Sequence, residues 1–436
     1  MLASSILVLA TAGSLTMASP VNTSPRAASP SSVELESRQA NLRSRTALEG
    51  MQEWYRSNTG LWDTAGWWQS GNLLTSLGDF ALAGLQSNVQ YRTIFENTFS
   101  RAQTNGARVV KERGDDNDVF SMARSTYTSF PGSSTSLNHR APSEIFVSVE
   151  RRAAMGHSDP HALVAEAERG FKGFINEYYD DEGWWALALF KAHDLGYGPQ
   201  YINMANSILE DMQRGKSPCG GIFWSKTSAY TNAIANELFL FVAASLANRI
   251  PTYKDHYLGI AKTQWEWFKN SGMINDKKLV NDGLYDWNDS NTARRCKNNG
   301  QATWSYNQGV LIGALVELSK ATGDSSVIRD YAKPIARATM ANLSPNGVLN
   351  DPCDPSNMCG GDGAQFKGVF MRNLRYLHKM YPEQDFADYI RRQSDSIWNN
   401  SRSGNKFGLR WAGPYVESNA VTNGIALDAF TAAESL

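Results

Sequence analysis

The sequence predicts an all-α fold in which about six helical hairpins close into a ring. Three observations support this prediction. From about Asn41 onward, apolar residues recur at offsets of three and four, as in amphipathic helices. Gly and Asn clusters separate most of these segments, and almost nothing alternates with the period of a strand. No repeat of fixed length is visible, which favours a closed ring over an open solenoid.

The expected helices follow one another with short connections. The first apolar pattern runs from Ala47 to Tyr55, and the second runs from Leu73 to Leu85. Further helices are expected at 88–104, 143–155, 160–176, 181–195, 199–213, 228–249, 252–270, 304–321, 325–341, 364–380, 384–399 and 420–434. Strand patterns are limited to short segments near 347–349 and 408–411. Neighbouring helices joined by short loops are expected to pack antiparallel.

The N-terminus indicates a secreted protein. Residues 1–18 are apolar or small and are expected to be a signal peptide, and the Ser- and Pro-rich residues 19–40 are expected to be a disordered leader. Residues 41–436 are then expected to form one domain. No later run of about 18 apolar residues suggests a membrane-spanning helix. The formal net charge of −1 argues against a nucleic-acid partner.

The four cysteines are expected to form disulfides, because an even number in a secreted chain favours pairing. Cys353 and Cys359 lie close in sequence and are expected to pair, which leaves Cys219 for Cys296. No CxxC or HExxH spacing is present, so we expect no metal and no cofactor. Sequons for N-glycosylation, which fit a secreted glycoprotein, occur at Asn22, Asn288, Asn342 and Asn399.

The segment 178–185 reads YYDDEGWW and places three adjacent acids between large aromatic rings. Such rings offer apolar faces to a pyranose, and two carboxyl groups provide the acid and the nucleophile for cleaving a glycosidic bond. Acids in a first helical turn also complement the helix dipole, so a purely structural interpretation stands beside the functional one. Gly183 costs about 1 kcal/mol in a helix relative to Ala. Close approach of a ligand is one explanation for it.

Asp180 and Asp181 are neighbours, and their side chains point about 100° apart on a helix. They can therefore reach one sugar from different angles. A carboxyl separation of roughly 5 Å would suit double displacement with retention of configuration. Two carboxylates this close do not ionise easily together, so one pKa is expected to rise and leave a protonated general acid.

The segment 178–185 resembles the active-site signature of glycoside hydrolase family 76, the endo-α-1,6-mannanases. Other segments resemble the family in the same order: 60–68, 219–224, 232–238, 265–274, 303–309 and 366–370. The resemblance implies an (α/α)6 barrel and a retaining enzyme that acts inside mannan chains. It also implies that Asp180 is the nucleophile and Asp181 the acid/base. The helical pattern agrees with the implied fold.

Thirteen further residues are candidates for substrate binding. Each has a structural alternative: core packing for the aromatic residues, ties between helices for the amides, and turn formation for the acids. The candidates are Trp67, Trp68, Asn72, Tyr179, Trp184, Trp185, Trp224, Asn232, Asn236, Asp286, Trp304, Gln308 and Asp362. The sequence leaves the choice between these roles open.

One stretch departs from the family pattern. About 65 residues, roughly 105–170, intervene where the family passes quickly to the paired acids, so they are either an insertion or an error in the gene model. The leading functional hypothesis is a monomeric, secreted endo-mannanase acting on α-1,6-mannan or a mannose-containing glycan. The first alternative is a cell-wall transglycosidase acting on mannose-containing lipid-anchor glycans. The second is a non-catalytic mannan-binding wall protein, which would need the tryptophans but not adjacent aspartates.

Overall fold

The structure is a computed structural model that describes residues 43–84, 89–104, 171–354, 359 and 361–436. The expected signal peptide, the leader, the 105–170 stretch and the helix expected at 143–155 lie outside the described residues. So does most of the helix expected at 160–176. Within its described remainder, Lys172–Phe174 forms a 3₁₀ turn (η2) instead of an α-helix.

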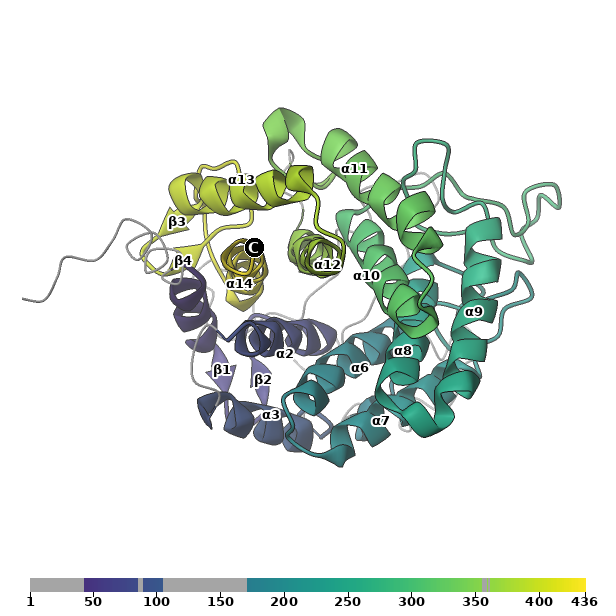
Figure 1. Cartoon of the computed structure of the whole chain (residues 1–436), viewed down its shortest axis with the longest axis horizontal. Coiled ribbons are helices and arrows are strands. Elements are labelled where there is room, and N and C mark those ends of the chain that lie inside the picture. The colour runs from purple at the N-terminus through teal and green to yellow at the C-terminus, as the bar shows by residue number, and fades with distance from the viewer. Residues whose placement is uncertain (1–42, 85–88, 105–170, 355–358, 360) are drawn as a thin grey trace, which may run out of the picture.

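Six buried helices form a closed inner ring (Figure 1). Each of them packs against the next, and the last packs against the first. They are α2 (Trp67–Leu82), α6 (Tyr179–Asp194), α8 (Ala233–Arg249), α10 (Ser305–Thr322), α12 (Phe366–Met380) and α14 (Ala420–Glu434). Most side chains of these helices are buried on all faces, as expected for helices enclosed by a second layer. We call the side-chain-filled interior of this ring the bore.

An outer ring surrounds the inner one and alternates with it along the chain (Figure 1). It consists of the helix at 43–52, α3 (Val89–Arg101), α7 (Pro199–Met212), α9 (Lys254–Asn270), α11 (Lys333–Asn342) and α13 (Gln384–Asn400). These helices bury one side only: in α7 the buried residues recur from Tyr201 to Met212 at helical spacing. The described helices therefore form six pairs, which confirms the expected (α/α)6 ring.

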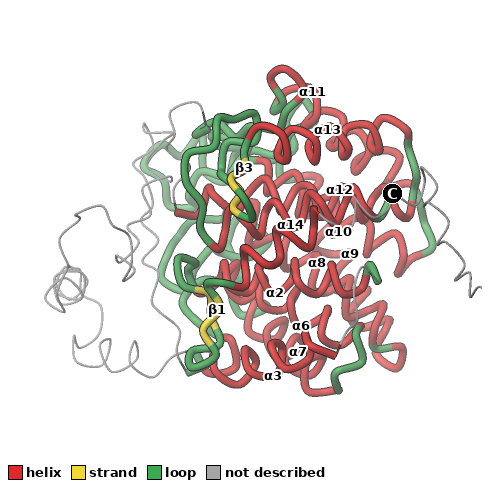
Figure 2. Tube along the Cα trace, turned by 90° about the vertical axis from the view of Figure 1, so that its left-hand side faces the viewer, coloured by secondary structure: helices red, strands yellow, loops and turns green. Residues whose placement is uncertain are grey.

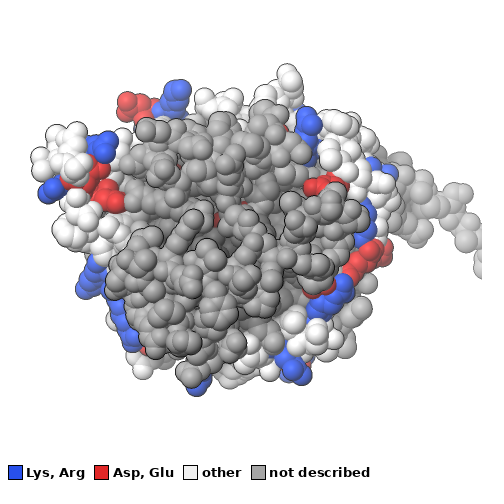
Figure 3. Space-filling model, turned by 180° about the vertical axis from the view of Figure 1, so that it is seen from behind, with Lys and Arg blue, Asp and Glu red and all other residues white. Residues whose placement is uncertain are grey.

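Long connections precede the inner helices and gather at one end of the barrel (Figure 2). Bridges such as Tyr178 with Ser225 and Asn232 with Gly283 hold these connections together. Short turns of three or four residues, for example 195–198 and 323–325, lie at the opposite end. Figure 3 views the end where the inner helices begin, and the charged side chains visible around its rim carry both signs.

Minor elements complete the fold. Strand β1 (Tyr55–Arg56) pairs antiparallel with β2 (Leu61–Trp62), and β3 (Arg402–Ser403) pairs antiparallel with β4 (Lys406–Phe407). The remaining turns are η3 (Pro251–Tyr253), the π-helical η4 (Ile328–Ala332), η5 (Pro345–Gly347) and η6 (Gly361–Gln365). No single described helix is long and apolar enough to cross a membrane. By length and composition alone, α8 and the segment Pro251–Asn270 could together span a membrane, but the two are bent by 117° relative to each other.

Three local predictions were wrong. No strand forms at 347–349 or 408–411. The pattern that continued to Tyr55 is interrupted, because Tyr55 pairs with Trp62 in β1. The helix expected from residue 228 begins only at Ala233, since the backbone of Thr231 accepts a hydrogen bond from Leu284 N at 3.0 Å. In the second and third cases backbone pairing outside the helix overrides the local pattern.

Both expected disulfides are confirmed, and both lie at the end with the long connections. Cys219 pairs with Cys296, with a Cα–Cα distance of 5.2 Å. Cys353 pairs with Cys359, with a Cα–Cα distance of 4.9 Å. The first links the connection before α8 to the connection before α10. The second closes a small loop before α12.

Candidate active site

The paired aspartates occupy the first turn of α6, which begins at Tyr179. Both are buried, with exposed fractions of 6% for Asp180 and 2% for Asp181. The positive end of the helix dipole favours carboxylates at this position. The same two residues therefore fit both the structural interpretation, as acids in a first helical turn, and the functional one.

Helical spacing shows which way these side chains point. Leu187 and Lys191 line a cavity inside the ring, at its opposite end. Asp180 lies seven residues before Leu187, and Trp184 lies seven residues before Lys191. Residues seven apart on a helix share a face. Asp180 and Trp184 therefore face the bore.

Asp181 points instead toward the connection that precedes α6. Its Oδ2 accepts a hydrogen bond from Asn176 Nδ2 at 2.8 Å. Glu182, the third acid, accepts from the Asn176 backbone N–H at 3.0 Å and from Lys226 Nζ at 2.9 Å. Burial raises the pKa of Glu182 well above its usual range, although Lys226 opposes the rise. Glu182 thus ties the start of α6 to the connection before α8.

Four aromatic rings from four inner helices form a layer across the bore next to Asp180. The ring centroids of Trp68 and Trp184 are 5.7 Å apart, and those of Trp184 and Tyr306 are 6.4 Å apart. Tyr306 stacks on Phe366 at 3.9 Å with an interplanar angle of 9°. Trp68 Nε1 also donates a hydrogen bond to Asp362 Oδ1 at 2.9 Å. The predicted residues Trp68, Trp184 and Asp362 therefore meet at one place.

Carboxyl groups surround Tyr306. Burial raises the pKa of the Tyr306 hydroxyl well above its usual range, and nearby carboxylates raise it further. Those carboxylates belong to Asp282, Asp180, Glu237 and Asp362. The phenol therefore remains a neutral hydroxyl that can donate a hydrogen bond.

Glu237 is a candidate that the sequence analysis missed. It lies four residues before Phe241 and eight before Ser245, which both line the bore, so it shares their helix face. It is fully buried, and neither carboxylate oxygen has a hydrogen-bond partner among the described residues. Burial, with a smaller contribution from Asp282, raises its pKa well above the usual range. In the sequence, Glu237 could have been noticed as a single acid within the mainly apolar run 233–247.

Trp67 and Trp185 do not lie in the bore, which corrects their assignment as sugar-binding residues. Trp67 Nε1 donates to the carbonyl of Ala102 at 2.9 Å, just beyond α3. The Trp185 ring lies 5.3 Å from Trp67 and 4.7 Å from Phe174. Both rings fill the core between the inner helices and α3. Because adjacent helical residues diverge, Trp184 faces the bore while Trp185 faces away from it.

The predicted amides connect elements of the barrel. Asn72 accepts from the guanidinium of Arg372, which ties α2 to α12. Asn232 caps α8 by accepting from Ala235 N at 3.2 Å. Asn236 bonds both backbone groups of Ile222, and Gln308 bonds both backbone groups of Val280. These contacts favour the structural alternative for all four side chains.

The remaining candidates lie in the connections around the bore. Trp224 packs 5.0 Å from Tyr178, and Trp304 packs 5.5 Å from Phe366. Tyr179 lies beneath Lys226, whose Nζ is 5.3 Å from the ring centroid. Asp286 is half-buried, and its carbonyl accepts from the Asp289 backbone N–H at 3.1 Å. Only Trp304 of these four packs directly against a ring of the aromatic layer.

Gly183 has a structural explanation. A Cβ at this position would lie 2.8 Å from the Cβ of Leu238 on α8, closer than real side chains approach. The glycine therefore allows α6 and α8 to pack closely. Ligand approach is not needed to account for it.

The model of glycosyl hydrolase family 76 matches residues 164–435, more than half of the chain and all of the paired-acid segment. The chain belongs to glycosyl hydrolase family 76. The matched region starts before α6 and ends just after α14, so it includes five of the six inner helices. The paired aspartates and the aromatic layer are therefore a candidate family 76 active site.

Relatives with assigned names are fungal. A mannan endo-1,6-alpha-mannosidase of Candida albicans is 26% identical over 225 residues, which are 47% of this chain and 48% of that protein. A mannan endo-1,6-alpha-mannosidase of Saccharomyces cerevisiae is 27% identical over 220 residues, 47% of each chain. The chain thus spans about half the length of the relatives it matches.

Solved structures share the fold. An alpha-1,6-mannanase of Salegentibacter has a TM-score of 0.66 at 18% identity, and the match covers 91% of this chain and 99% of that one. That structure is an inactive variant with two consecutive aspartates replaced by asparagine, in complex with alpha-1,6-mannotriose. Dfg5 from Chaetomium thermophilum, in complex with glucosamine, has a TM-score of 0.65 at 17% identity, covering 91% and 90% of the two chains.

Proposed function

We propose that this family 76 protein hydrolyses internal α-1,6-mannosidic bonds of mannan with retention of configuration. The observation that carries the proposal is the Asp180–Asp181 pair at the start of α6, with Asp180 facing the aromatic layer of the bore. The names of the fungal relatives and of the Salegentibacter neighbour support the substrate class. The consecutive aspartates replaced in that inactive neighbour support the choice of catalytic residues.

In the first step, Asp180 attacks the anomeric carbon while the proton of the Asp181 carboxyl passes to the departing glycosidic oxygen. The glycosidic C–O bond breaks, a glycosyl ester forms on Asp180, and Asp181 is left as a carboxylate. In the second step, Asp181 takes a proton from water, and the resulting oxygen attacks the anomeric carbon. The ester bond breaks, Asp180 is released as a carboxylate, and the two inversions give net retention.

The surroundings suit these separate roles. Asp180 faces the bore, where the sugar ring would lie against the flat faces of Trp184 and Tyr306. Asp181 is held by Asn176 on the side of the incoming connection. Tyr306 and Glu237, both neutral because burial raises their pKa values, can donate hydrogen bonds to sugar hydroxyls.

The protein is proposed to act outside the cell, at or near a mannan-containing wall. Three of the four sequons lie in the described residues, and Asn288, Asn342 and Asn399 are exposed there. Each is therefore open to a glycan in the folded protein. The two disulfides fit an oxidising compartment.

Incubation with unbranched α-1,6-mannan tests the activity. Product sizes are followed by mass spectrometry, and the new anomeric protons are followed by NMR from the first minutes. An endo-acting, retaining enzyme first releases oligomannosides of mixed length in the α configuration. Release of mannose alone, or first products in the β configuration, would contradict the proposal. Lengthened acceptor oligosaccharides without net hydrolysis would favour the transglycosidase.

A further inference from the structure

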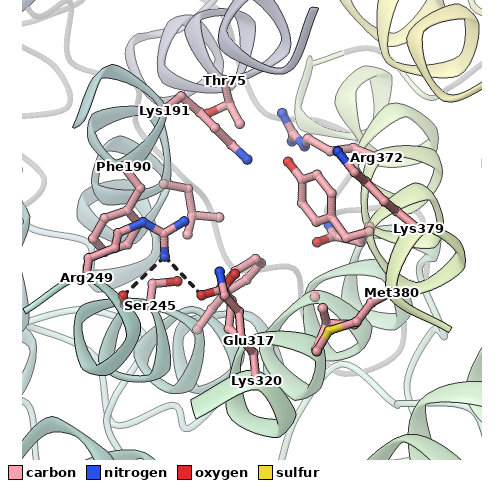
Figure 4. Close-up of a pocket in the computed structure, with 16 residues that line it drawn as sticks. Thr75, Phe190, Lys191, Ser245, Arg249, Glu317, Lys320, Arg372, Lys379 and Met380 are labelled. Carbon is pink, nitrogen blue, oxygen red and sulfur yellow. Dashed lines mark hydrogen bonds and ion pairs between the residues drawn. The ribbon is translucent and has the colours of Figure 1, made fainter. Parts of the chain in front are cut away.

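A cavity lies inside the ring, at the end opposite the paired acids (Figure 4). Its volume is about 400 Å³, and five inner helices, α2, α6, α8, α10 and α12, contribute to its walls. Small-molecule sites commonly have volumes of roughly 300–1,000 Å³. We call it the far-end cavity.

The far-end cavity is separate from the candidate active site. On α6, Lys191 lies eleven residues after Asp180, roughly 16 Å along the helix axis at 1.5 Å per residue. The ring of Trp184 lies between these two levels and packs on Tyr306. On α10, Tyr306 likewise precedes the first lining residue, Gly313, by two turns. A ligand in this cavity would therefore be on the other side of the aromatic layer from the nucleophile.

The walls of the far-end cavity are mainly apolar. Phe190 lines one side and Phe241 the next, and Val316 and Met380 continue the surface on α10 and α12. Met380 is 39% exposed, which places it at the opening. An apolar chain or ring that left water for this space would gain about 25 cal/mol for each Å² of apolar surface buried.

Most charged side chains around the cavity are neutralised by partners. Lys191 Nζ lies 2.9 Å from Asp79. Arg249 pairs with Glu317 at 2.9 Å, as Figure 4 shows, and with Asp194 at 2.7 Å on its other side. Arg372 pairs more loosely with Asp428 at 3.9 Å and donates to Asn72. Each of these three cations therefore already has a carboxyl or amide partner.

Two lining cations remain without such a partner. Lys320, in the last turn of α10, and Lys379, in the last turn of α12, form no ion pair or hydrogen bond within the described part of the chain. Both are exposed, and their helices pack against each other. The cavity thus combines a mainly apolar interior with two lysines at its opening that have no ion-pair partner among the described residues.

We propose that the far-end cavity binds an amphiphilic anion, with its carboxylate or phosphate head group between Lys320 and Lys379. The apolar part of the ligand would lie against Phe190 and Phe241. Charge-assisted hydrogen bonds to an ammonium group select an anionic head group. The apolar wall selects against a free inorganic anion or a sugar. This site is separate from the candidate active site and does not depend on the proposed function.

Titration of the full-length protein with sodium decanoate, followed by calorimetry below the micellar concentration, tests this site. Decanol serves as the probe without charge, and acetate as the head group without a chain. The Lys320→Met/Lys379→Met variant removes both charges and keeps the stem volume. A matched control is Lys254→Met/Lys262→Met, which removes two exposed lysines from α9. Thermal unfolding verifies that both variants are folded.

The wild type and the α9 control are expected to bind decanoate with the same Kd, and the cavity variant at least tenfold more weakly. Decanol and acetate are expected to bind much more weakly than decanoate to the wild type and to the α9 control, and the cavity variant is expected to lose the preference for decanoate over decanol. Sedimentation with phosphatidylglycerol vesicles shows whether a membrane lipid can supply the same chemistry. Lysine-dependent binding to decanoate or to the vesicles supports the site and identifies the source. No binding to either, or equal loss in both double variants, overturns it.

Discussion

The side-chain amide of Asn176 donates a hydrogen bond to Asp181 Oδ2 at 2.8 Å. The same residue donates its backbone N–H to Glu182 and accepts from the backbone N–H of Tyr178 at 2.9 Å. One asparagine therefore fixes both the entry into α6 and the orientation of the proposed acid/base.

Replacing Asn176 with Ala is expected to impair catalysis more than binding. Loss of the donor lets the Asp181 carboxyl rotate away from the glycosidic oxygen, and a misplacement of about 1 Å can cost on the order of 10²-fold in rate. We expect kcat on α-1,6-mannan to fall about 10- to 100-fold with KM changed less than about threefold. Asn270→Ala, an exposed helix-end asparagine, is the matched control. A purely raised KM would argue against the orienting role.

Phe substitutions at the two adjacent tryptophans distinguish a side chain that faces the bore from one that packs in the core. Trp184→Phe is expected to lower kcat/KM for mannan oligosaccharides about fivefold or more, because a smaller ring offers less stacking surface. Trp185→Phe is expected to lower the free energy of unfolding by roughly 1–3 kcal/mol through the cavity it leaves, with kcat/KM of the folded enzyme unchanged. Steady-state kinetics well below Tm and urea unfolding give the two readouts. Equal kinetic defects in both variants would contradict this assignment.

The two disulfides are expected to differ in their effect on stability. Cys219–Cys296 spans 77 residues and Cys353–Cys359 spans 6. Loop entropy then predicts a loss of about 4 kcal/mol for the Cys219→Ala/Cys296→Ala variant and about 2 kcal/mol for the Cys353→Ala/Cys359→Ala variant. Urea unfolding under non-reducing conditions measures both. The ordering is the test: a larger loss from the short loop would contradict it.

The stability of the fold should depend on Asp428, which is buried in α14. Burial raises its pKa from 3.8 to about 7, although Arg372 opposes the rise. Between about pH 4 and 7 the folded state therefore keeps a proton that the unfolded chain has released, so stability falls as pH increases through this window. Glu434 and Asp351, with pKa values raised by burial to about 7 and about 6, act in the same direction.

Asp428→Asn mimics the neutral acid and should make this decrease shallower. We expect the fall in unfolding free energy from pH 5 to pH 7 to shrink by on the order of 2 kcal/mol, since each pH unit corresponds to about 1.4 kcal/mol per proton. Urea unfolding at pH 5, 6, 7 and 8 provides the measurement. Asp388→Asn, at an exposed position on α13, should follow the wild-type profile. A parallel decrease in the Asp428 variant would rule out this residue as a source.

The ring of helix pairs was predictable because the outer helices carry one-sided apolar patterns, the inner helices are long apolar runs, and Gly and Asn clusters separate most of them. Both disulfides followed from cysteine spacing. The strands were not predictable, since Tyr55–Arg56 pairs with Leu61–Trp62 through two residues each, too few for a pattern. The start of α8 was also missed, because contacts with the distant residue Leu284 determine it. Local sequence does not contain such long-range pairing.

The site was predictable in part. The unusual acids and rings of 178–185 stood out, but sequence could not tell which tryptophan faces the bore. That choice depends on packing against α2 and α3, which places Trp184 inside and Trp185 outside. The amides were ambiguous because a buried Asn such as Asn236 must form hydrogen bonds wherever it lies. The sequence does not show whether its partner is another part of the barrel or a ligand. Glu237 was overlooked because a buried acid looks like a helix-surface acid in sequence.

In the proposed mechanism, Asp180 and Asp181 act on one glycosidic bond as nucleophile and acid/base, while other residues bind the sugar. The most direct test measures hydrolysis of unbranched α-1,6-mannan by Asp180→Asn and Asp181→Asn, together with calorimetric binding of α-1,6-mannotriose. Asp255→Asn, an exposed aspartate on α9, is the control. We expect each active-site variant to lose about 10³-fold or more in kcat while binding mannotriose within a few-fold of the wild-type Kd. Near-normal hydrolysis by either variant would contradict the account.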